Sequence, residues 1–130
     1  MVDRLFVYGT LRAGQSARRM IEHHVSASEP ARCRGTLYAF AAGYPGVLLD
    51  GDTVIVGELV HLDDLAAALP LLDGYEGEDF TRILTEVEAG TGLERAWIYV
   101  LSDPALAATG TVIASGDWVS EVAAQPPRGG

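Results

Sequence analysis

Residues 5–12 constrain the fold of this chain more than any other stretch. They join a short apolar, β-favouring segment to an abrupt polar end, in the order Leu-Phe-Val-Tyr-Gly-Thr-Leu-Arg. This pattern predicts a buried strand that stops in a tight turn. Gly9 lacks a Cβ atom, so the backbone at the turn can approach a neighbouring group closely. The backbone N–H groups of residues 10–12 are suited to hold a carboxylate or an oxyanion, although a plain strand-to-helix turn accounts for the same residues.

The length of 130 residues fits one domain with a core of its own. Hydrophobic residues make up 48% of the chain and charged residues 21%, as in an ordinary globular protein. No internal repeat or interior linker divides the sequence, so we expect a single domain over residues 1–122. The segment from Ala123 to Gly130 is too polar and too rich in proline and glycine to pack. We predict a disordered tail there.

The formal net charge is -9, from 18 acidic and 9 basic residues. Because affinity for nucleic acid and for anionic lipid depends on clustered lysine and arginine, this balance argues against both partners. Cys33 is the one cysteine, so no disulfide can form within the chain. Its arginine neighbours can lower a thiol pKa, but a half-buried strand position is the expected environment. No basic-then-apolar leader opens the sequence and no apolar run approaches the roughly 20 residues that span a bilayer, so we expect a cytoplasmic location.

Alternation, turn residues and helical spacing together predict a mixed set of short elements. Strands are expected at residues 4–8, 32–40, 47–49, 53–61, 80–88 and 94–101. A short helix is expected over residues 16–23, and a second one from a cap at Asp63 to a terminating Gly74. The pair Asp50-Gly51 marks a turn between two of the strands, and Gly90-Thr91-Gly92 marks the turn around which the strands at residues 80–88 and 94–101 are expected to pair. Because strands and helices do not alternate strictly, we predict an α+β domain with a curled or closed, mainly antiparallel sheet.

Four carboxylates crowd the segment Asp73-Gly74-Tyr75-Glu76-Gly77-Glu78-Asp79, which follows the end of the predicted helix. Negative charge at a helix C-terminus opposes the helix dipole, and repulsion among the carboxylates raises their pKa values. Such an unfavourable local electrostatic energy is typical of a functional site, although a solvated acidic loop also fits the pattern. Glu76 is the best candidate because Tyr75 can shield it from water. A sheltered carboxylate with a pKa near neutrality can accept a proton from an amine and return it to a leaving group.

The remaining residues give little support to other chemistry. The sequence has no nucleophile elbow, P-loop or dinucleotide-binding glycine pattern. His23 and His24 are adjacent and do not face one another on a helix, so no metal site is predicted. We expect structural or surface roles for these two and for His61. Ser115 and Asp117 flank a glycine before a tryptophan, which predicts a turn with an aromatic anchor, and a serine-based triad has no geometric support.

Taken together, these segments resemble the γ-glutamylcyclotransferase-like family, also called AIG2-like. Residues 6–12 look like its Y-G-[ST]-L strand-end loop, and residues 72–77 look like the L-D-x-x-E-G segment that carries its catalytic glutamate. Further matches follow in family order: Gly14-Gln15-Ser16, Gly43-Tyr44-Pro45-Gly46, Gly57-Glu58-Leu59, Phe80-Thr81-Arg82, Ala96-Trp97-Ile98-Tyr99-Val100 and Ser115-Gly116-Asp117-Trp118. The resemblance covers nearly all of residues 4–118. No single motif is specific, but so many in order are hard to obtain by chance.

The resemblance implies a γ-glutamylcyclotransferase-like fold, a small mixed β-barrel flanked by short helices. It implies that the γ-glutamyl group of a small-molecule substrate lies against Tyr8, Gly9, Thr10 and Leu11, with backbone N–H groups on its carboxylate. Glu76 would act as general base and then as general acid. The substrate's amine attacks its own γ-carbonyl group, which releases 5-oxoproline and an amine or amino acid. This intramolecular reaction depends on proximity and needs no cofactor.

Two places depart from the family pattern. Ala17 and Arg18 stand where small bacterial members often have an asparagine and a bulky polar residue, and Phe80 replaces a tyrosine. By the same resemblance, Phe80 and Arg82 belong to the substrate-binding set. Arg82 either pairs with a glutamyl carboxylate or balances the nearby acidic residues Glu78 and Asp79. We favour an ion pair within the protein, because such pairs are common.

Two other functions fit the same residues. One is a non-catalytic module that uses this fold to bind a γ-glutamyl compound or a small acid. The other is a different acyl or amine reaction in the same pocket. The sequence carries no recognisable code for the leaving amine. A monomer or a weak homodimer is expected.

Overall fold

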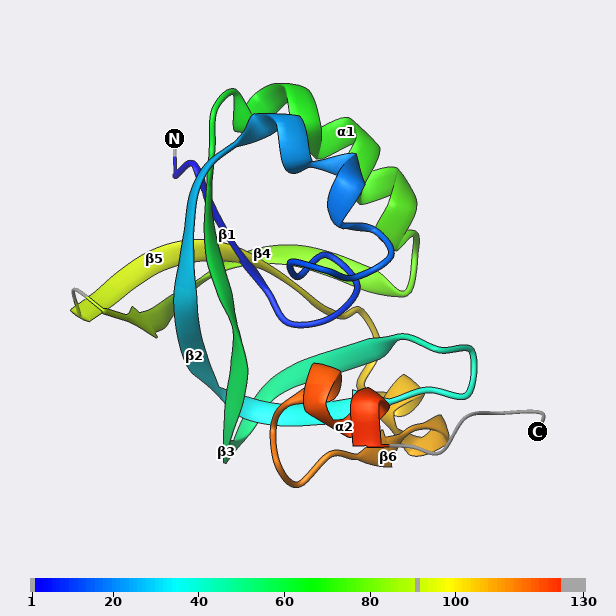
Figure 1. Ribbon diagram of the computed structural model, residues 1–130. Helices are drawn as coiled ribbons and strands as arrows, with labels where there is room; N and C mark the ends of the chain where they lie inside the picture. Colours follow the sequence, from blue (N-terminus) through cyan, green and yellow to red (C-terminus); the bar gives the residue numbers. More distant parts are fainter. Residues whose placement is uncertain (1, 91, 125–130) are drawn as a thin grey trace.

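The computed structural model describes residues 2–90 and 92–124, and Figure 1 shows their arrangement. Within these residues the elements follow in this order, with η marking short 3₁₀ helices: β1 (Arg4–Val7), η1 (Arg18–Met20), η2 (Glu22–His24), β2 (Val25–Ala39), β3 (Pro45–Leu62), α1 (Leu65–Glu76), β4 (Phe80–Ala89), β5 (Gly92–Leu101), η3 (Pro104–Thr109), β6 (Thr111–Val112) and α2 (Trp118–Ala124). None of the described helices has the length and apolar character that crossing a membrane requires.

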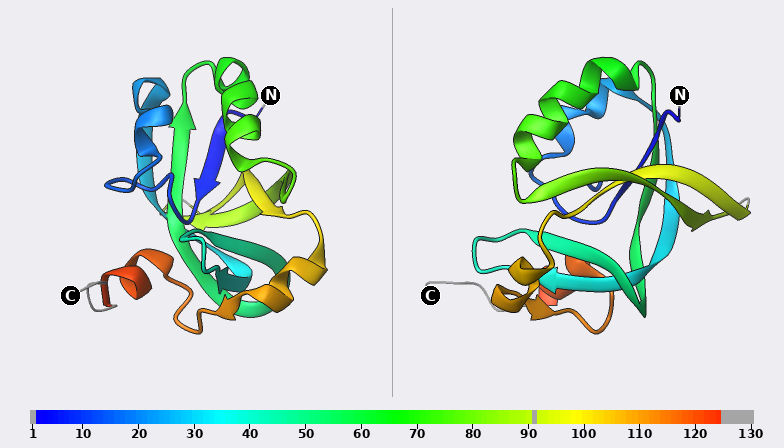
Figure 2. Two further views of the ribbon diagram at one scale, coloured as in Figure 1. Left: turned by 90° about the vertical axis from the view of Figure 1, so that its right-hand side faces the viewer. Right: turned by 180° about the vertical axis from the view of Figure 1, so that it is seen from behind.

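The strands form one curled sheet whose pairing returns to its starting strand. The order is β3-β1-β5-β4-β2-β6, and β2 also pairs with β3, which closes the first five strands of this order into a barrel-like ring. Among the described pairs, β1 and β5 run parallel and the others are antiparallel. Figure 2 shows α1 and η1 at one end of the molecule and η3 and α2 at the other. The predicted α+β class with a curled, mainly antiparallel sheet is confirmed.

The start of β2 corrects the prediction for this region. The strand expected at residues 32–40 begins at Val25. Its first half is polar and contains Pro30, so local composition gave no strand signal. The register pairs Pro30 with Glu58 of β3. A long-range ladder, rather than local propensity, makes this half a strand.

The strand β3 runs unbroken where the sequence predicted two strands and a turn. Gly35 of β2 pairs with Thr53, and the next residue of β2 pairs with Leu48, so the intervening part of β3 bulges out of the ladder. Gly51 adopts a φ of 112° within this bulge. The turn signal therefore bends a continuous strand instead of ending it. Figure 1 shows both long strands turning sharply in the lower part of the molecule.

The strand β1 is buried on both faces because it separates two apolar clusters. Phe6 and Tyr8 pack within the ring of strands, against side chains of β2, β3, β4 and β5. Leu5 and Val7 pack against α1 and the segment that carries η1. This burial on both faces explains why the first strand is a continuous apolar run in the sequence.

The helix α1 begins and ends later than predicted. Asp64 rather than Asp63 caps its N-terminus, and the capping side chain accepts a backbone hydrogen bond from the first turn. Gly74 lies inside the helix, which continues to Glu76 and is capped by Gly77 at a φ of 73°. Glycine adopts this left-handed conformation without strain. The later end places Glu76 in the last helical turn rather than in a loop.

The predicted boundaries of the first helix and of the C-terminal tail also differ from the structure. The helix expected over residues 16–23 is replaced by the two short turns η1 and η2. Ala123 and Ala124, which were assigned to the polar tail, belong to α2, and the rest of that prediction lies outside the described residues. The hairpin of β4 and β5 is confirmed, with Ala89 paired to Gly92.

Candidate active site

A cavity of about 300 Å³ opens where the end of β1, the start of β3 and the end of α1 meet. This volume lies at the lower end of the range for small-molecule sites. The residues that line it are Phe6, Val7, Tyr8, Gly9, Thr10, Leu11, Tyr44, Pro45, Tyr75, Glu76, Asp79, Phe80 and Tyr99. Two segments contribute most of the lining. We call residues 8–11 the loop wall and residues 75–80 the helix wall.

The loop wall carries two backbone donors without a partner among the described residues. Gly9 lies directly against Pro45, and a Cβ atom at Gly9 would collide with that ring. The close backbone approach expected at Gly9 is therefore present, and it needs a residue without a side chain. The N–H groups of Thr10 and Leu11 make no hydrogen bond within the described part of the chain. Two such donors at a cavity are suited to bind an anionic group.

Glu76 gives the helix wall a carboxyl group whose pKa lies close to neutral pH. Burial raises the pKa of Glu76 from an ordinary 4.5 to about 7. Glu76 lines the same cavity as Tyr8 of the loop wall. Burial and, second, the charge of Glu76 raise the pKa of Tyr8. No hydrogen bond or ion pair joins the Glu76 side chain to another described residue. The group is therefore available to a bound molecule and can exist in both protonation states near pH 7.

A hydrogen-bonded cluster holds the last turn of α1 against β4 and β5. Asp73 accepts two hydrogen bonds from the guanidinium group of Arg82, at 3.1 and 3.2 Å. It accepts a third from the Tyr99 hydroxyl at 2.6 Å. The Arg82 hydrogen bonds are the main reason that the pKa of Asp73 is lowered. Arg82 also lies over the Trp97 ring, 4.7 Å from its centroid. This cluster fixes the helical turn that carries Glu76.

Aromatic rings form much of the remaining lining. The rings of Tyr44 and Phe80 meet edge to face, with centroids 6.0 Å apart. The Tyr75 hydroxyl lies 2.8 Å from the Thr10 hydroxyl oxygen, and this hydrogen bond joins the two walls. No lysine or arginine is among the described lining residues, whereas Asp79 is. The helix wall therefore presents apolar rings and negative charge.

The structure brings together most of the predicted site residues. Those that line the cavity are Tyr8, Gly9, Thr10, Leu11, Glu76 and Phe80. Arg82 lies outside the lining, and its partner is Asp73 rather than the expected Glu78 or Asp79. The preference for an ion pair within the protein agrees with this contact, although the partner was wrong.

Sequence reasoning missed several lining residues. It identified Tyr44 and Pro45 only as part of a turn, and it gave Tyr99 and Asp79 no role in the site. These residues reach the cavity because distant strands fold back on one another. The one signal for three of them, Tyr44, Pro45 and Tyr99, was that they belong to motifs of the family order, since no local pattern encodes such contacts.

The other candidate residues stay outside the cavity. Cys33 is buried in β2, and burial raises the pKa of its thiol to about 12, as expected for an inert strand cysteine. His61 lies 3.2 Å from a carboxylate oxygen of Glu29, and His23 and His24 contact each other through their rings. Within the described residues, no group of histidine, cysteine or acidic side chains is arranged to hold a metal ion.

Comparison with known proteins assigns this chain to a family. A family model described as gamma-glutamyl cyclotransferase, AIG2-like, matches residues 5–120. The chain belongs to this γ-glutamylcyclotransferase family. The match includes the loop wall and the helix wall, so the resemblance carried by the motifs is confirmed.

Curated relatives agree with the family assignment. The chain is 33% identical over 119 residues to YkqA of Bacillus subtilis, whose name places it among the γ-glutamylcyclotransferases, with 91% of this chain and 42% of YkqA covered. It is 31% identical over 105 residues to the γ-L-glutamyl-butirosin B γ-glutamyl cyclotransferase of Niallia circulans, with 76% and 67% covered. A Vibrio cholerae protein named for the same activity is 32% identical over 124 residues, with 94% and 100% covered. The chain thus spans less than half the length of YkqA.

A solved structure confirms the fold. The crystal structure of YkqA matches this chain with a TM-score of 0.72 at 31% identity, covering 94% of this chain and 43% of that one. A TM-score of this size reflects the same arrangement of strands and helices. The expected γ-glutamylcyclotransferase-like fold is therefore confirmed.

Proposed function

We propose that this chain converts a γ-glutamyl amide into 5-oxoproline and an amine, with Glu76 as general base and then general acid. The observation that supports this most is the state of Glu76. Its carboxyl group lines the cavity, has a pKa of about 7 and has no partner among the described residues. A group in this state can accept a proton and return it without leaving the pH range near neutrality.

In the proposed complex the γ-glutamyl group lies between the two walls. Its α-carboxylate accepts hydrogen bonds from the Thr10 and Leu11 N–H groups, which have no partner within the described residues. Its α-amino group lies within reach of Glu76. The leaving amine extends toward the rings of Tyr44 and Phe80. Tyr8 and Gly9 complete the surface under the glutamyl chain.

The reaction moves one proton to Glu76 and back. The Glu76 carboxylate takes a proton from the uncharged α-amino group as that nitrogen attacks the γ-carbonyl carbon of the same molecule. A new C–N bond closes the five-membered ring, and the amide C–N bond to the leaving group breaks. The protonated Glu76 gives its proton to the departing nitrogen, which leaves as an amine. The substrate supplies both nucleophile and electrophile, so the rate gain comes from proximity and proton transfer rather than from a cofactor.

The test is the release of 5-oxoproline from a panel of γ-glutamyl amines, γ-glutamyl dipeptides and glutathione. We expect the parent chain to turn over part of this panel and the Glu76→Gln variant to lose at least about 100-fold in kcat, because it keeps the shape of the side chain without its proton acceptor. The control variant is Glu78→Gln, which changes a neighbouring exposed carboxylate outside the cavity lining. It should retain the parental kcat. Equal rates for the parent and Glu76→Gln would contradict the proposed role.

A second candidate is a binding module without catalysis. Phe80 favours it, because this ring stands in the cavity where the family pattern has a tyrosine, so the wall lacks that hydroxyl. A binding module would show thermal stabilisation by γ-glutamyl compounds and no release of 5-oxoproline. Turnover of any member of the panel would exclude this candidate.

A further inference from the structure

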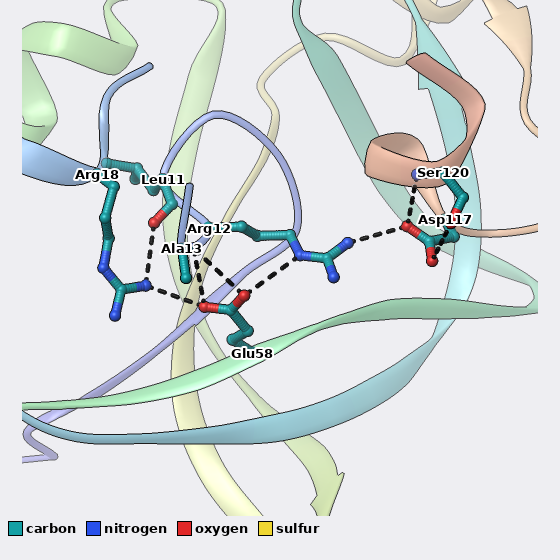
Figure 3. Close-up of polar contacts among 7 residues, drawn as sticks. All are labelled: Leu11, Arg12, Ala13, Arg18, Glu58, Asp117 and Ser120. Atoms are coloured by element: carbon teal, nitrogen blue, oxygen red, sulfur yellow. Dashed lines mark hydrogen bonds and ion pairs between the residues drawn. The ribbon is translucent and has the colours of Figure 1, made fainter. Parts of the chain in front are cut away.

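A second charged cluster lies beside the loop wall and outside the cavity lining, and Figure 3 shows its contacts. At its centre is Glu58 of β3. One carboxylate oxygen accepts a hydrogen bond from Arg18 Nη1 at 2.9 Å, and the Ala13 backbone nitrogen lies 3.1 and 3.3 Å from the two oxygens. Arg12 Nε lies 3.6 Å from the second oxygen. One carboxylate therefore meets two guanidinium groups and a backbone N–H.

Arg12 connects this cluster to the C-terminal helix. Its Nη1 donates a hydrogen bond at 2.9 Å to Asp117, which precedes α2 and also accepts hydrogen bonds from the Ser120 N–H and hydroxyl groups. The side chains of Arg12, Glu58 and Asp117 are 14%, 17% and 24% exposed. Three segments that are far apart in the sequence therefore meet at one mostly buried arginine (Figure 3).

The cluster fixes the far end of the loop wall. Arg18 Nη1, which is bound to Glu58, also donates a hydrogen bond to the Leu11 carbonyl at 3.4 Å. The Ala13 N–H is bound to the same carboxylate. Because backbone groups on both sides of Arg12 depend on one side chain, Glu58 determines the path of the chain there. Neutralising it would remove the counterion that the two guanidinium groups share and leave Arg12 with Asp117 and Arg18 with Glu22 as carboxylate partners.

The near end of the loop wall is fixed in a different way. Gly9 is wedged against Pro45, and its carbonyl accepts a hydrogen bond from the Arg12 N–H at 3.0 Å. Thr10 and Leu11 therefore lie between two anchored points. Their N–H groups are the donors that the proposed function assigns to the substrate's α-carboxylate. The direction of these donors depends on both anchors, and one of the two anchors depends on Glu58.

We propose that Glu58 is a positioning residue, which orients the Thr10 and Leu11 N–H groups toward the α-carboxylate of the γ-glutamyl group. This inference rests on the proposed function, because it needs the loop wall to bind that carboxylate. Glu58 lies outside the cavity lining and moves no proton. The α-carboxylate takes no part in bond making or breaking, so its binding is the same in the ground state and the transition state. Loss of positioning therefore raises KM and leaves kcat unchanged.

The experiment compares Glu58→Gln with the parent chain on two substrates. One is a γ-glutamyl amide, and the other is the matching γ-aminobutyryl amide, which keeps the amine and the amide but lacks the α-carboxylate. For the γ-glutamyl amide we expect KM to rise about 10-fold while kcat stays within about twofold. For the γ-aminobutyryl amide we expect kcat/KM to stay within about twofold of the parental value. General loss of folding would lower both rates alike.

The matched control is Glu29→Gln, which removes another partly exposed, paired carboxylate on β2, where its partner is His61. It should retain the parental constants on both substrates. An unchanged KM for the γ-glutamyl amide in Glu58→Gln would overturn the inference, as would an equal loss on both substrates. If Glu58→Gln does not fold, Arg12→Lys decides the question, because lysine keeps the charge without the planar guanidinium group. We expect its KM to rise about threefold, and an unchanged KM would overturn the inference.

A measurement without turnover separates this inference from the proposed function. The affinity of the γ-glutamyl amide for the Glu76→Gln chain is measured by calorimetry, and Glu58→Gln is then added to that background. We expect Kd to rise about 10-fold. An unchanged Kd overturns the positioning role even where the parent releases 5-oxoproline. A parent chain that binds the amide and releases no 5-oxoproline contradicts the proposed function alone.

Discussion

An arginine–carboxylate cluster holds each of the two walls of the cavity, but only the helix wall contributes carboxylates to the cavity lining. Behind the helix wall, Asp73 is bound by Arg82, and beside the loop wall, Glu58 is bound by Arg18. Both clusters are arginine–carboxylate pairs with further hydrogen bonds. Glu76 lines the cavity itself and has no partner among the described residues. The comparison teaches that the paired carboxylates hold the walls in place, whereas the buried carboxylate without a described partner is the one whose pKa lies near neutrality.

The contrast is sharpest within a single helical turn. Asp73 and Glu76 both belong to the end of α1. Hydrogen bonds from Arg82 lower the pKa of Asp73, and burial raises the pKa of Glu76 to about 7. Two acidic side chains three positions apart therefore differ in protonation near neutral pH, because burial favours the neutral form of Glu76 whereas Arg82 stabilises the charged form of Asp73.

The largest expected effect tests whether the helix wall takes part in proton transfer while the loop wall only binds substrate. Glu76→Gln should lower kcat at least about 100-fold and change KM less than about threefold, because it removes proton transfer and little binding. Glu58→Gln should instead raise KM about 10-fold and leave kcat within about twofold of the parental value. Steady-state kinetics of both variants on one γ-glutamyl amide measure this. If both variants lower kcat to a similar extent, the distinction between a reacting wall and a binding wall is wrong.

The next effect concerns stability and pH. The folded pKa of Glu76, about 7, lies above its ordinary value of 4.5. Between these values the folded chain binds more protons than the unfolded chain, so its stability falls as pH rises through this window, and the loss is complete above about pH 7. Glu76→Gln lacks this penalty. We expect the variant to be more stable than the parent by about 1–2 kcal/mol at about pH 8 and equal to it at about pH 4.

Urea unfolding of the parent and of Glu76→Gln at both pH values checks this prediction. The control is Glu78→Gln, which changes an exposed carboxylate. Its difference in stability from the parent should be the same at both pH values. The same pKa should appear in the kinetics. Because the proposed base must be deprotonated at the start, kcat/KM should fall as pH drops below about 7. A stability difference that does not change with pH would mean that Glu76 is not sheltered in solution.

A third effect follows from the charged groups of a substrate that each wall is suited to bind. The loop wall offers N–H donors for an anion, whereas the helix wall offers aromatic rings and the carboxylate of Asp79, with no cation among the described lining residues. A leaving group that carries its own carboxylate meets no counterion there. We expect kcat/KM to be about 10-fold higher for the γ-glutamyl amide of a diamine than for a γ-glutamyl dipeptide. Asp79→Asn should reduce this ratio, and a preference for the dipeptide would refute the assignment of charges.

The sequence predicted the parts of this site that local patterns encode. The buried first strand ends at Val7, one residue before the predicted end, and Gly9 follows it in the turn that the glycine indicated. The glutamate singled out by its acidic surroundings lines the same cavity as Gly9. The hairpin of β4 and β5 followed from alternation and a glycine-rich turn. These features depend on neighbours within about ten residues. The α+β class followed from the mixed order of short elements, whereas the γ-glutamylcyclotransferase-like fold and the pairing of the two walls needed the family order of motifs as well.

The errors have a common physical cause in long-range contacts. The polar first half of β2 becomes a strand because β3 pairs with it. The helix α1 continues beyond Gly74 because the next suitable left-handed glycine is Gly77 and because Asp73 is bound from β4 and β5. The sequence paired Arg82 with the nearest acidic residues and missed Asp73. Contacts of this kind depend on how the sheet curls, which no local pattern states.

The smallest expected effect tests whether Asp73 supports Glu76. Asp73→Asn keeps the size of the side chain and weakens its bonds to Arg82 and Tyr99. Because the Asp73 side chain is 44% exposed, solvent screening limits the loss of stability to about 1 kcal/mol. We also expect a roughly threefold fall in kcat, since the helical turn that carries Glu76 becomes less fixed.

The pH dependence of Asp73→Asn should run opposite to that of Glu76→Gln. The folded pKa of Asp73 is lowered, so its contribution is present above the ordinary value of 3.8 and is lost as pH falls through the folded value. The destabilisation measured by urea at about pH 7 should therefore become smaller as pH falls below the ordinary pKa of 3.8. A control at Asp103, which caps η3 and lies outside the cavity lining, should lose stability on change to alanine, which removes the capping oxygen, without any fall in kcat. If Asp73→Asn behaves like that control, the cluster behind the helix wall holds the fold and has no part in placing the reacting carboxylate.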